Sequence, residues 1–356
     1  MERRIAKEVK IGSVRIGGNN PVVIQSMTNT DTRDVQATLA QIRQLAEIGC
    51  EVIRVAVLNE QAAVALEEIC GMSPIPVVAD IHFDYHLALK AVEGGVHGLR
   101  INPGNIGEKW KVQEVVRAVQ ERKIPIRIGV NTGSLEKDIL EKYRGVSAEG
   151  MVESALSHVR ILEDLGYDQI KISLKASKVP LMVDAYRQIA GMVDYPLHIG
   201  VTEAGTVKSG VVKSAVGIGT LLAEGIGDTI RVSLTGNPIA EIPVATNILR
   251  VLNLKEGGFE LISCPTCGRT QIELAQLADD VEQQLEALPS PEKRITVAVM
   301  GCVVNGPGEA READFGIAGG KGRGMLFQKG EVVAHLPEEE LVPALMQRIK
   351  QHIQCR

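Results

Sequence analysis

The sequence predicts a (β/α)8 barrel followed by a smaller α+β domain. From about residue 20 to 252, a short β-branched run and an amphipathic helical stretch alternate eight times. Glycines stand where four of these helices would end in a left-handed cap, at Gly49, Gly94, Gly166 and Gly225. Eight such units in about 230 residues match this barrel in count and length. The alternation stops around residues 255–259, where a different module begins.

The predicted strands are short aliphatic runs, as expected of parallel strands that are buried on both faces. They are Val22–Gln25, Val52–Val57, Val77–Ile81, Gly98–Asn102, Ile126–Asn131, Gln169–Leu174, Leu197–Val201 and Thr229–Leu234. The helices predicted after them carry apolar residues at helical spacing. They are Val35–Ile48, Gln61–Ile69, Tyr85–Glu93, Lys109–Arg122, Met151–Leu165, Met182–Met192, Ser209–Glu224 and Ala240–Leu252.

An open doubly wound sheet uses the same strand–helix unit and is the alternative fold. Such a sheet usually stops at five or six strands and carries a glycine fingerprint for phosphate after its first strand. Here the first strand leads into Gln25-Ser-Met-Thr-Asn-Thr, which lacks that fingerprint. The barrel is therefore favoured.

The predicted domain boundaries are 1–253 for the barrel, 254–262 for a linker and 263–356 for the α+β domain. This second domain is expected to contain two helices, a strand that leads into Cys302, and a hairpin-like region rich in glycine. These elements are a helix near Gln271–Leu288, strands Thr296–Met300, Phe315–Ala318, Met325–Phe327 and Val332–His335, and a closing helix Pro337–Ile353.

Composition excludes several classes of protein. Only 3% of the 356 residues are aromatic while 45% are hydrophobic, so the core must be aliphatic. A net charge of −5 gives no sign of a nucleic-acid surface. The first ten residues have no apolar stretch of the signal-peptide type, and no run of 18 apolar residues is present to span a membrane. Six cysteines in so long a chain make a disulfide framework improbable, so a cytoplasmic location is expected.

Polar residues gather near the carboxyl ends of the predicted strands, where barrel active sites form. They are Arg54; Asp80 and His82; Arg100 and Asn102; Arg127 and Asn131; Lys171, Ser173 and Lys175; His198, Thr202 and Glu203; and Arg231 and Ser233. Most are spaced by two, so each set lies on one side of its strand. If that side faces inward, four arginines and at least one lysine share one cavity, and only an anion such as a diphosphate or bisphosphate would make their burial tolerable. The alternative is that these residues point outward into ordinary ion pairs.

Three cysteines stand on Gly/Pro-rich turns in the second domain. Cys264-Pro-Thr-Cys267 is followed 35 residues later by Cys302, and Glu309 lies seven residues beyond. Thiolates on rigid turns are typical of metal centres, and three thiolates plus one other ligand fit an iron–sulfur cluster. The same spacing fits a structural zinc site, and the Cys-x-x-Cys pair alone fits a disulfide.

Seven motifs together resemble the family of bacterial 4-hydroxy-3-methylbut-2-en-1-yl diphosphate synthases over essentially the whole chain. They are Gln25-Ser-Met-Thr-Asn-Thr, Val78-Ala-Asp-Ile-His-Phe-Asp84, Leu99-Arg-Ile-Asn-Pro-Gly104, Arg127-Ile-Gly-Val-Asn-Thr-Gly-Ser-Leu135, Gly200-Val-Thr-Glu-Ala-Gly205, Cys264-Pro-Thr-Cys-Gly-Arg269 and Gly301-Cys-Val-Val-Asn-Gly-Pro-Gly-Glu309. The resemblance implies reductive ring opening and dehydroxylation of 2-C-methyl-D-erythritol 2,4-cyclodiphosphate in isoprenoid biosynthesis. It also implies a [4Fe–4S] cluster, with flavodoxin or ferredoxin as the donor of single electrons, and a head-to-tail homodimer.

The family's functional residues carry over onto matching positions. The resemblance makes Cys264, Cys267, Cys302 and Glu309 the cluster ligands, and Glu203 and Asn305 catalytic. It makes the following residues the substrate contacts: Arg54, Asp80, His82, Arg100, Asn102, Arg127, Asn131, Lys171, Thr202, Arg231 and Ser233. Two other functions remain as alternatives, a non-catalytic iron–sulfur sensor and a zinc-stabilised barrel lyase or transferase.

Overall fold

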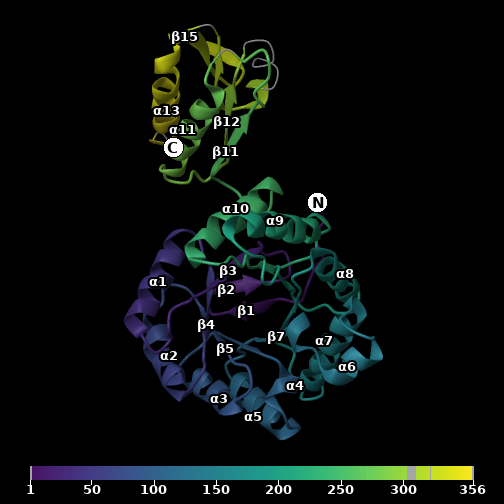
Figure 1. The fold of residues 1–356 in the computed structure, drawn as a ribbon. Coiled ribbons are helices and arrows are strands. Elements are labelled where there is room, and N and C mark those ends of the chain that lie inside the picture. Colours follow the sequence, from purple (N-terminus) through teal and green to yellow (C-terminus); the bar gives the residue numbers. More distant parts are fainter. Residues whose placement is uncertain (1, 271, 303–309, 321, 355–356) are drawn as a thin grey trace. The chain divides into compact units, whose positions relative to one another are not determined.

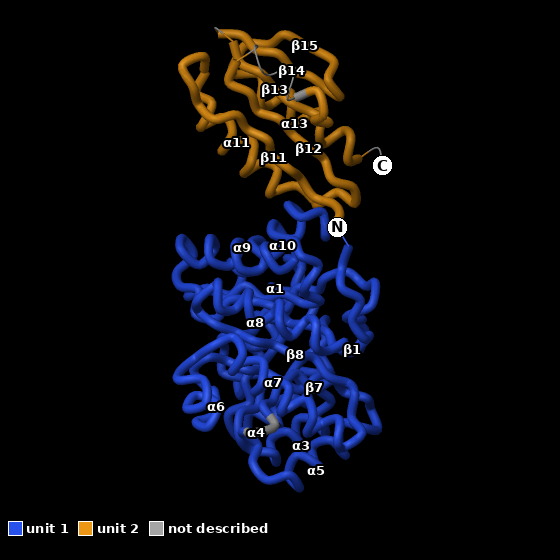
Figure 2. Tube along the Cα trace, turned by 90° about the vertical axis from the view of Figure 1, so that its right-hand side faces the viewer, with its two compact units in different colours: residues 1–255 blue, residues 256–356 orange. Residues whose placement is uncertain are grey.

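The chain folds into two compact units, Met1–Lys255 and Glu256–Arg356 (Figure 2). The computed structural model describes residues 2–270, 272–302, 310–320 and 322–354.

The first unit is built around an eight-stranded sheet in which every strand pairs in parallel with its neighbours. Its strands run in the order β8-β7-β6-β5-β4-β3-β10-β9. A single parallel bridge between Ile172 and Leu197 joins the two ends of that order and closes the barrel. The strands are β3 Val23–Met27, β4 Val52–Ala56, β5 Val77–Asp80, β6 Gly98–Ile101, β7 Ile126–Asn131, β8 Ile170–Lys175, β9 His198–Ile199 and β10 Thr229–Ile230. The predicted barrel is confirmed.

A ring of helices surrounds the strands (Figure 1). The long helices are α1 Val35–Glu47, α2 Glu60–Met72, α3 Tyr85–Glu93, α5 Lys109–Gln120, α7 Ala148–Glu163, α8 Val179–Ala190, α9 Val207–Ala223 and α10 Glu241–Val251. Short helices that were not predicted lie in the loops: α4 Pro103–Ile106, η1 Thr132–Ser134, α6 Lys137–Lys142 and η2 Pro238–Ala240. Side chains of Asp34, Asn59, Asp84 and Ser147 cap four of the helices by accepting a backbone N–H.

A hairpin that the sequence analysis missed precedes the barrel. Strands β1 Val9–Ile11 and β2 Val14–Ile16 pair around a turn at Gly12, whose φ is +57°. Val9, Ile11 and Ile16 are buried in one cluster with Val23, Val52 and Val78 of strands β3, β4 and β5. These last three residues stand near the amino ends of their strands, so the hairpin closes that end of the barrel.

The second unit is a five-stranded sheet with two helices. The sheet order is β11-β12-β13-β14-β15, with the first three strands parallel and the last two pairings antiparallel. Its elements are β11 Phe259–Ser263, α11 Leu274–Glu286, β12 Ile295–Met300, η3 Ala310–Glu312, β13 Phe315–Gly319, β14 Arg323–Gln328, β15 Glu331–Pro337 and α13 Glu338–Gln354. The core of this unit includes Val281, Val297, Ile317 and Leu345.

The linker expected at 254–262 differs from the structure, because residues from Phe259 onward form strand β11. Phe259 and Leu261 pack against the core of the second unit, and β11 pairs with β12 from Phe259 opposite Ile295. The apolar residues Phe259, Leu261 and Ile262 within five positions were the signal for this strand. Among the described helices, none is long and apolar enough to cross a membrane.

Candidate functional site

Four charged residues form one row around the inside of the barrel. Asp80 is in register with Arg100, Arg100 with Arg127, and Arg127 with Lys171. Their neighbours along each strand, such as Ala79, Leu99, Ile128 and Ile172, belong to the aliphatic core beneath the helices. Because strand residues alternate faces, the charged residues point into the barrel. The prediction of an inward-facing charged set is therefore confirmed for these strands.

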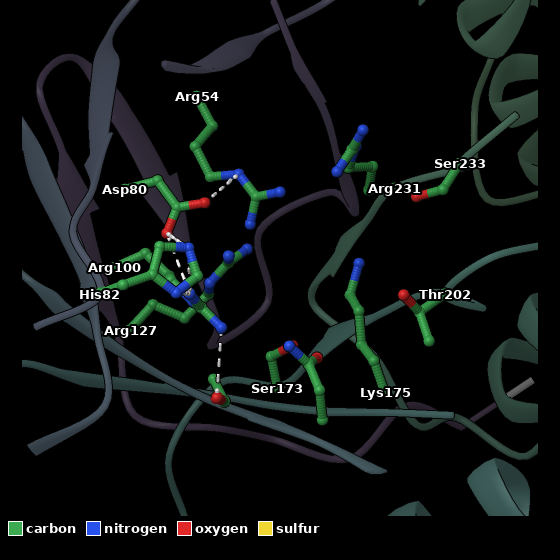
Figure 3. Close-up of a pocket in the computed structure, with 12 residues that line it drawn as sticks. Arg54, Asp80, His82, Arg100, Arg127, Ser173, Lys175, Thr202, Arg231 and Ser233 are labelled. Atoms are coloured by element: carbon green, nitrogen blue, oxygen red, sulfur yellow. Dashed lines mark hydrogen bonds and ion pairs between the residues drawn. The ribbon is translucent and has the colours of Figure 1, made fainter. Parts of the chain in front are cut away.

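A cavity of about 200 Å³ lies at the carboxyl ends of the strands. It is lined by Arg54, Asp80, His82, Arg100, Arg127, Gly129, Asn131, Ser173, Lys175, Thr202, Arg231 and Ser233 (Figure 3). The structure thus brings together all the predicted substrate contacts except Asn102 and Lys171. Four arginines and one lysine face this space, and Asp80 is the one carboxylate among these lining residues.

Asp80 is the ionic centre of one side of the cavity. Its Oδ1 accepts a hydrogen bond from Arg100 Nη1 at 3.0 Å, and its Oδ2 lies 3.5 Å from Arg54 Nε. His82 Nε2 lies 3.7 Å from Oδ1. Burial by itself raises the pKa of Asp80, but Arg54, Arg100 and Arg127 together lower it to about 2. Asp80 is therefore ionised and holds two guanidinium groups in place (Figure 3).

Several buried guanidinium nitrogens have no hydrogen-bond partner among the described residues. They are Nε of Arg100, Nε and Nη1 of Arg127, and Nε of Arg231. Burial, and then Arg54 and Arg100, lower the pKa of Arg127 well below its usual value. Arginine nevertheless keeps its charge in proteins. An uncompensated buried charge is strongly unfavourable, so this cavity is built to receive an anion with several oxygens.

Lys175 is the lysine that reaches the cavity, and Gly200 provides the room for it. A Cβ at Gly200 would lie 2.3 Å from the Arg231 carbonyl oxygen and 3.2 Å from Lys175 Nζ. Burial, followed by Arg231 and Arg127, lowers the pKa of Lys175 well below its usual value. An anion in the cavity would raise that pKa again and favour the charged ammonium.

Lys171, which the resemblance predicts as a substrate contact, lies deeper in the barrel than Lys175. It is only 2% exposed, stands four residues before Lys175 on β8, and does not line the cavity. In the same interior, His198 Nδ1 lies 2.7 Å from Thr229 Oγ1, while its Nε2 has no hydrogen-bond partner among the described residues. Burial, and then Arg127, lower the pKa of His198 well below its usual value, so its imidazole is neutral.

Three further predicted residues lie outside the cavity lining or outside the described residues. Asn102 is buried just after β6 and does not line the cavity. Glu203 is exposed, and its φ of +51° places a non-glycine residue in the left-handed region beside the lining residue Thr202. Such strain is often found at functional sites. Asn305 is not among the described residues.

The prediction also left out residues that shape the cavity. Ser173 and Lys175 were recognised as polar strand residues but were not selected as contacts. Glu241 is buried, accepts a hydrogen bond from Ser26 Oγ at 3.0 Å and lies 3.7 Å from Arg231 Nε. Met27 Sδ accepts from Arg54 Nη2 at 2.8 Å. The spacing of two on β8 was a signal that Lys175 faces the cavity. Glu241 lies on helix α10, and no sequence pattern indicated its contact with Arg231.

The cysteine motifs follow the carboxyl ends of two neighbouring parallel strands. Cys264 comes directly after β11 and Cys302 two residues after β12, and Ser263 is in register with Val299. Cys264 Sγ accepts the Gly301 backbone N–H at 3.2 Å, and Cys267 is exposed. No group of three potential metal ligands is formed among the described residues. The predicted fourth ligand, Glu309, falls outside them.

Solved structures of other proteins have folds similar to that of this chain. A 3-dehydroquinate dehydratase from Geobacillus kaustophilus is 15% identical, with a TM-score of 0.50 over 71% of this chain and 98% of that one. An N-acetylneuraminic acid synthetase from Leptospira borgpetersenii is 13% identical, with a TM-score of 0.50 over 80% of this chain and 98% of that one. At such low identity, these similarities show the fold alone.

Comparison of the sequence is far more specific. The GcpE TIM-barrel domain matches residues 6–246, and the GcpE protein C-terminal domain matches residues 260–351. A protein from Geobacter sulfurreducens named 4-hydroxy-3-methylbut-2-en-1-yl diphosphate synthase (flavodoxin) is 62% identical over 97% of both chains. One of the same name from Clostridium acetobutylicum is 58% identical over 98% of this chain and 99% of that protein. The chain therefore belongs to the GcpE family.

Proposed function

We propose that this chain catalyses reductive ring opening and dehydroxylation of 2-C-methyl-D-erythritol 2,4-cyclodiphosphate to 4-hydroxy-3-methylbut-2-enyl diphosphate in isoprenoid biosynthesis. The observation that carries this proposal is the set of buried guanidinium nitrogens that find no hydrogen-bond partner among the described residues and surround a cavity of about 200 Å³. A cyclic diphosphate offers many anionic oxygens in a compact shape, which suits such a set. The relatives named above carry the name of the enzyme that makes this product.

The residues of the barrel have separate tasks in this proposal. Arg54, Arg100, Arg127, Lys175 and Arg231 bind the diphosphate oxygens. These oxygens supply acceptors for the nitrogens of Arg100, Arg127 and Arg231 that have no hydrogen bond among the described residues. Ser173, Asn131, Thr202 and Ser233 supply neutral hydrogen bonds around them. Asp80, ionised and anchored by two arginines, fixes the direction of the guanidinium groups before the substrate arrives.

Acid–base chemistry is assigned to Glu203. Loss of a hydroxyl group as water requires a proton donor at the departing oxygen. Glu203 follows the cavity residue Thr202 directly, and its exposed carboxyl stands on a left-handed backbone in the loop between β9 and α9. We keep Asn305 and Asn102 as proposed contacts on the strength of the family resemblance.

The second unit is proposed to hold a [4Fe–4S] cluster with Cys264, Cys267, Cys302 and Glu309. The donor set suits it, because three thiolates on turns after neighbouring strands are soft ligands for iron. The Gly301 N–H at 3.2 Å from Cys264 Sγ is also the type of contact that tunes a cluster. When bound, such a cluster supplies two electrons one at a time. The chain's own part is to hold the thiolates and to bind the substrate.

The proposed donor of these electrons is flavodoxin, the donor printed in the names of the relatives, with ferredoxin as the alternative. We further propose a homodimer and a cytoplasmic location. The homodimer rests on the family resemblance, and the location on the cysteine content.

The test is anaerobic purification followed by iron analysis, visible absorption and turnover of the cyclodiphosphate. We expect about four irons per chain, a coloured protein and turnover with reduced flavodoxin. Glu203→Gln should keep its iron and its affinity for diphosphate while losing turnover. A colourless protein with stoichiometric zinc would support the zinc-stabilised enzyme. A wild-type protein that holds iron and binds the cyclodiphosphate but does not turn it over would support the sensor.

Cysteine variants provide a matched control for the cluster. Cys264→Ser and Cys267→Ser should lose iron. Cys50→Ser and Cys70→Ser should keep it, because burial raises the pKa of both Cys50 and Cys70 to about 12 and keeps these thiols protonated. Equal iron content in all four variants would contradict the ligand assignment.

A further inference from the structure

The hydrogen bonds between β8 and β9, the two strands that close the barrel, differ from those between its other neighbouring strands. We call this junction the seam. Below the cavity, Ile172 N donates to Pro196 O at 2.9 Å, as in a regular parallel ladder. At the top of the seam, Thr202 N donates to Ala176 O at 3.3 Å. Between these two bonds, the regular pattern calls for Leu174 N to donate to His198 O.

Leu174 N does not donate to His198 O; the hydroxyl of Tyr186 bridges these two groups instead. Leu174 N donates to Tyr186 Oη at 2.9 Å, and Tyr186 Oη donates to His198 O at 2.5 Å. Tyr186 belongs to α8, and its side chain is among the largest that are fully buried. Burial raises the pKa of Tyr186 far above its usual value, so the hydroxyl stays protonated and able to donate. One oxygen atom is thus inserted between the two strands.

This insertion lies beside the proposed anion site. Strand β8 carries Ser173 and Lys175, which flank Leu174, and the chain after β9 carries Gly200 and Thr202. Lys175 Nζ would be only 3.2 Å from a Cβ at Gly200, so the lysine side chain crosses the seam that Tyr186 holds open. Figure 3 shows Lys175 and Thr202 next to each other on this side of the cavity.

We propose that Tyr186 is a positioning residue for anion binding: its inserted hydroxyl sets the spacing of β8 and β9, and thereby places Lys175 against Gly200 and Thr202. Without the hydroxyl, the buried Leu174 N–H and His198 carbonyl lose their partners, which is unfavourable. Direct pairing of these two groups relieves that loss but draws β9 toward β8. The space over Gly200 that Lys175 needs then narrows.

The proposal rests on the proposed function only in that the cavity binds a diphosphate. Its test compares Tyr186→Phe with Tyr167→Phe in the anaerobically purified, full-length protein. Tyr167 is a suitable control because it is also buried and its hydroxyl also donates a hydrogen bond to a backbone carbonyl, that of Ile124 at 2.5 Å, and neither residue lines the cavity. Both variants lose one buried hydroxyl, so both should lose stability, and Tyr186→Phe should lose more because two backbone groups lose their partner instead of one.

Calorimetric titration with inorganic pyrophosphate gives the readout, together with KM and kcat for the cyclodiphosphate. For Tyr186→Phe we expect roughly tenfold weaker pyrophosphate binding and a similar rise in KM, with kcat and the visible spectrum little changed. Tyr167→Phe should bind as the wild type does. Wild-type affinity in Tyr186→Phe, or equal losses in both variants, would overturn the positioning role.

The test also separates this proposal from the proposed function. If the wild-type protein binds neither pyrophosphate nor the cyclodiphosphate, the proposed function fails, whatever the Tyr186 variant does. If Tyr186→Phe does not fold, 4-aminophenylalanine at position 186 supplies an amine that can both donate and accept. Restored folding with restored affinity supports the positioning role, and restored folding with the tenfold loss in affinity overturns it.

Discussion

The carboxylate of Asp80 accepts a hydrogen bond from Arg100 at 3.0 Å, with both side chains less than a tenth exposed. Arg54 lies on the other carboxylate oxygen, at 3.5 Å from Oδ2. One carboxylate therefore serves as counter-charge to two of the four arginines that line the cavity. This imbalance leaves positive charge in excess and prepares the cavity for an anion.

Asp80→Asn should destabilise the protein when no anion is bound. Removing one partner of a buried ion pair costs about 3–5 kcal/mol, because the remaining charge stays buried without compensation. Urea denaturation measures this loss, and added pyrophosphate should restore more stability to the variant than to the wild type. Asp31→Asn is the control, since Asp31 pairs with Arg33 on the surface and should matter little. Equal effects of the two substitutions would contradict the role of Asp80.

The same carboxylate predicts how stability depends on pH. The pKa of Asp80 is lowered to about 2 in the folded protein, from about 3.9 in an unfolded chain. Its contribution is then fully present above about pH 4 and is lost as the pH falls toward 2, and it amounts to about 2 kcal/mol. Asp80→Asn should therefore flatten the stability profile between pH 4 and pH 2. An unchanged slope would mean that Asp80 is not held ionised by its arginines.

Much of the fold could be predicted because the barrel repeats one local pattern. Strand β7 and helix α3 have the predicted bounds, Ile126–Asn131 and Tyr85–Glu93. Strands β9 and β10 are shorter than predicted, although Leu197, Val201 and Val232 are as apolar as the rest. Regular pairing there is limited by tertiary contacts such as the Tyr186 hydroxyl, which no local pattern reveals. The β1–β2 hairpin was missed because strands of three residues give too short a period to recognise.

The sequence could predict which strands contribute residues to the site, but not how deep in the barrel each of these residues lies. Spacing by two correctly placed Asp80 and Arg100 on the inner face. It could not distinguish Lys171 from Lys175, because both share that face and differ only in their distance from the carboxyl end. Glu241 and Tyr186 act from helices, where sequence periodicity indicates burial and not contact with the cavity.

Two lysine variants test this difference in depth. Lys175→Met should weaken pyrophosphate binding by roughly ten- to a hundredfold, because it removes a charged donor from the cavity wall. Lys171→Met should leave binding nearly unchanged, since Lys171 does not line the cavity. It should also raise the free energy of unfolding, because burial and Arg127 already disfavour a charge on that lysine. Calorimetric titration and urea denaturation of both variants check this. Weaker pyrophosphate binding by Lys171→Met than by Lys175→Met would show that Lys171 is the contact.

Binding should take up protons. Burial and the neighbouring Arg231 and Arg127 lower the pKa of Lys175 in the empty cavity, and a bound anion raises it again. The complex therefore holds more protons than the free protein. Affinity for the anion should fall as the pH rises from the pKa of Lys175 in the empty cavity to its higher pKa in the complex. Titrations in two buffers of different ionisation enthalpy should give different apparent heats, and Lys175→Met should reduce that difference. Identical heats in both buffers would show that no proton is taken up.

Gly200 should tolerate no side chain, although its place on the barrel wall looks ordinary in the sequence. A Cβ there meets the Arg231 carbonyl oxygen at 2.3 Å, and backbone atoms cannot move aside cheaply. It also meets Lys175 Nζ at 3.2 Å. Gly200→Ala should therefore push β10 and Lys175 away from their positions and weaken pyrophosphate binding by at least about tenfold. Gly219→Ala is the matched control: Gly219 lies within α9, a Cβ there meets nothing within 4 Å, and alanine is the better helix former. That variant should bind as the wild type does and unfold at a slightly higher urea concentration, whereas wild-type affinity in Gly200→Ala would show that Lys175 does not depend on the space over Gly200.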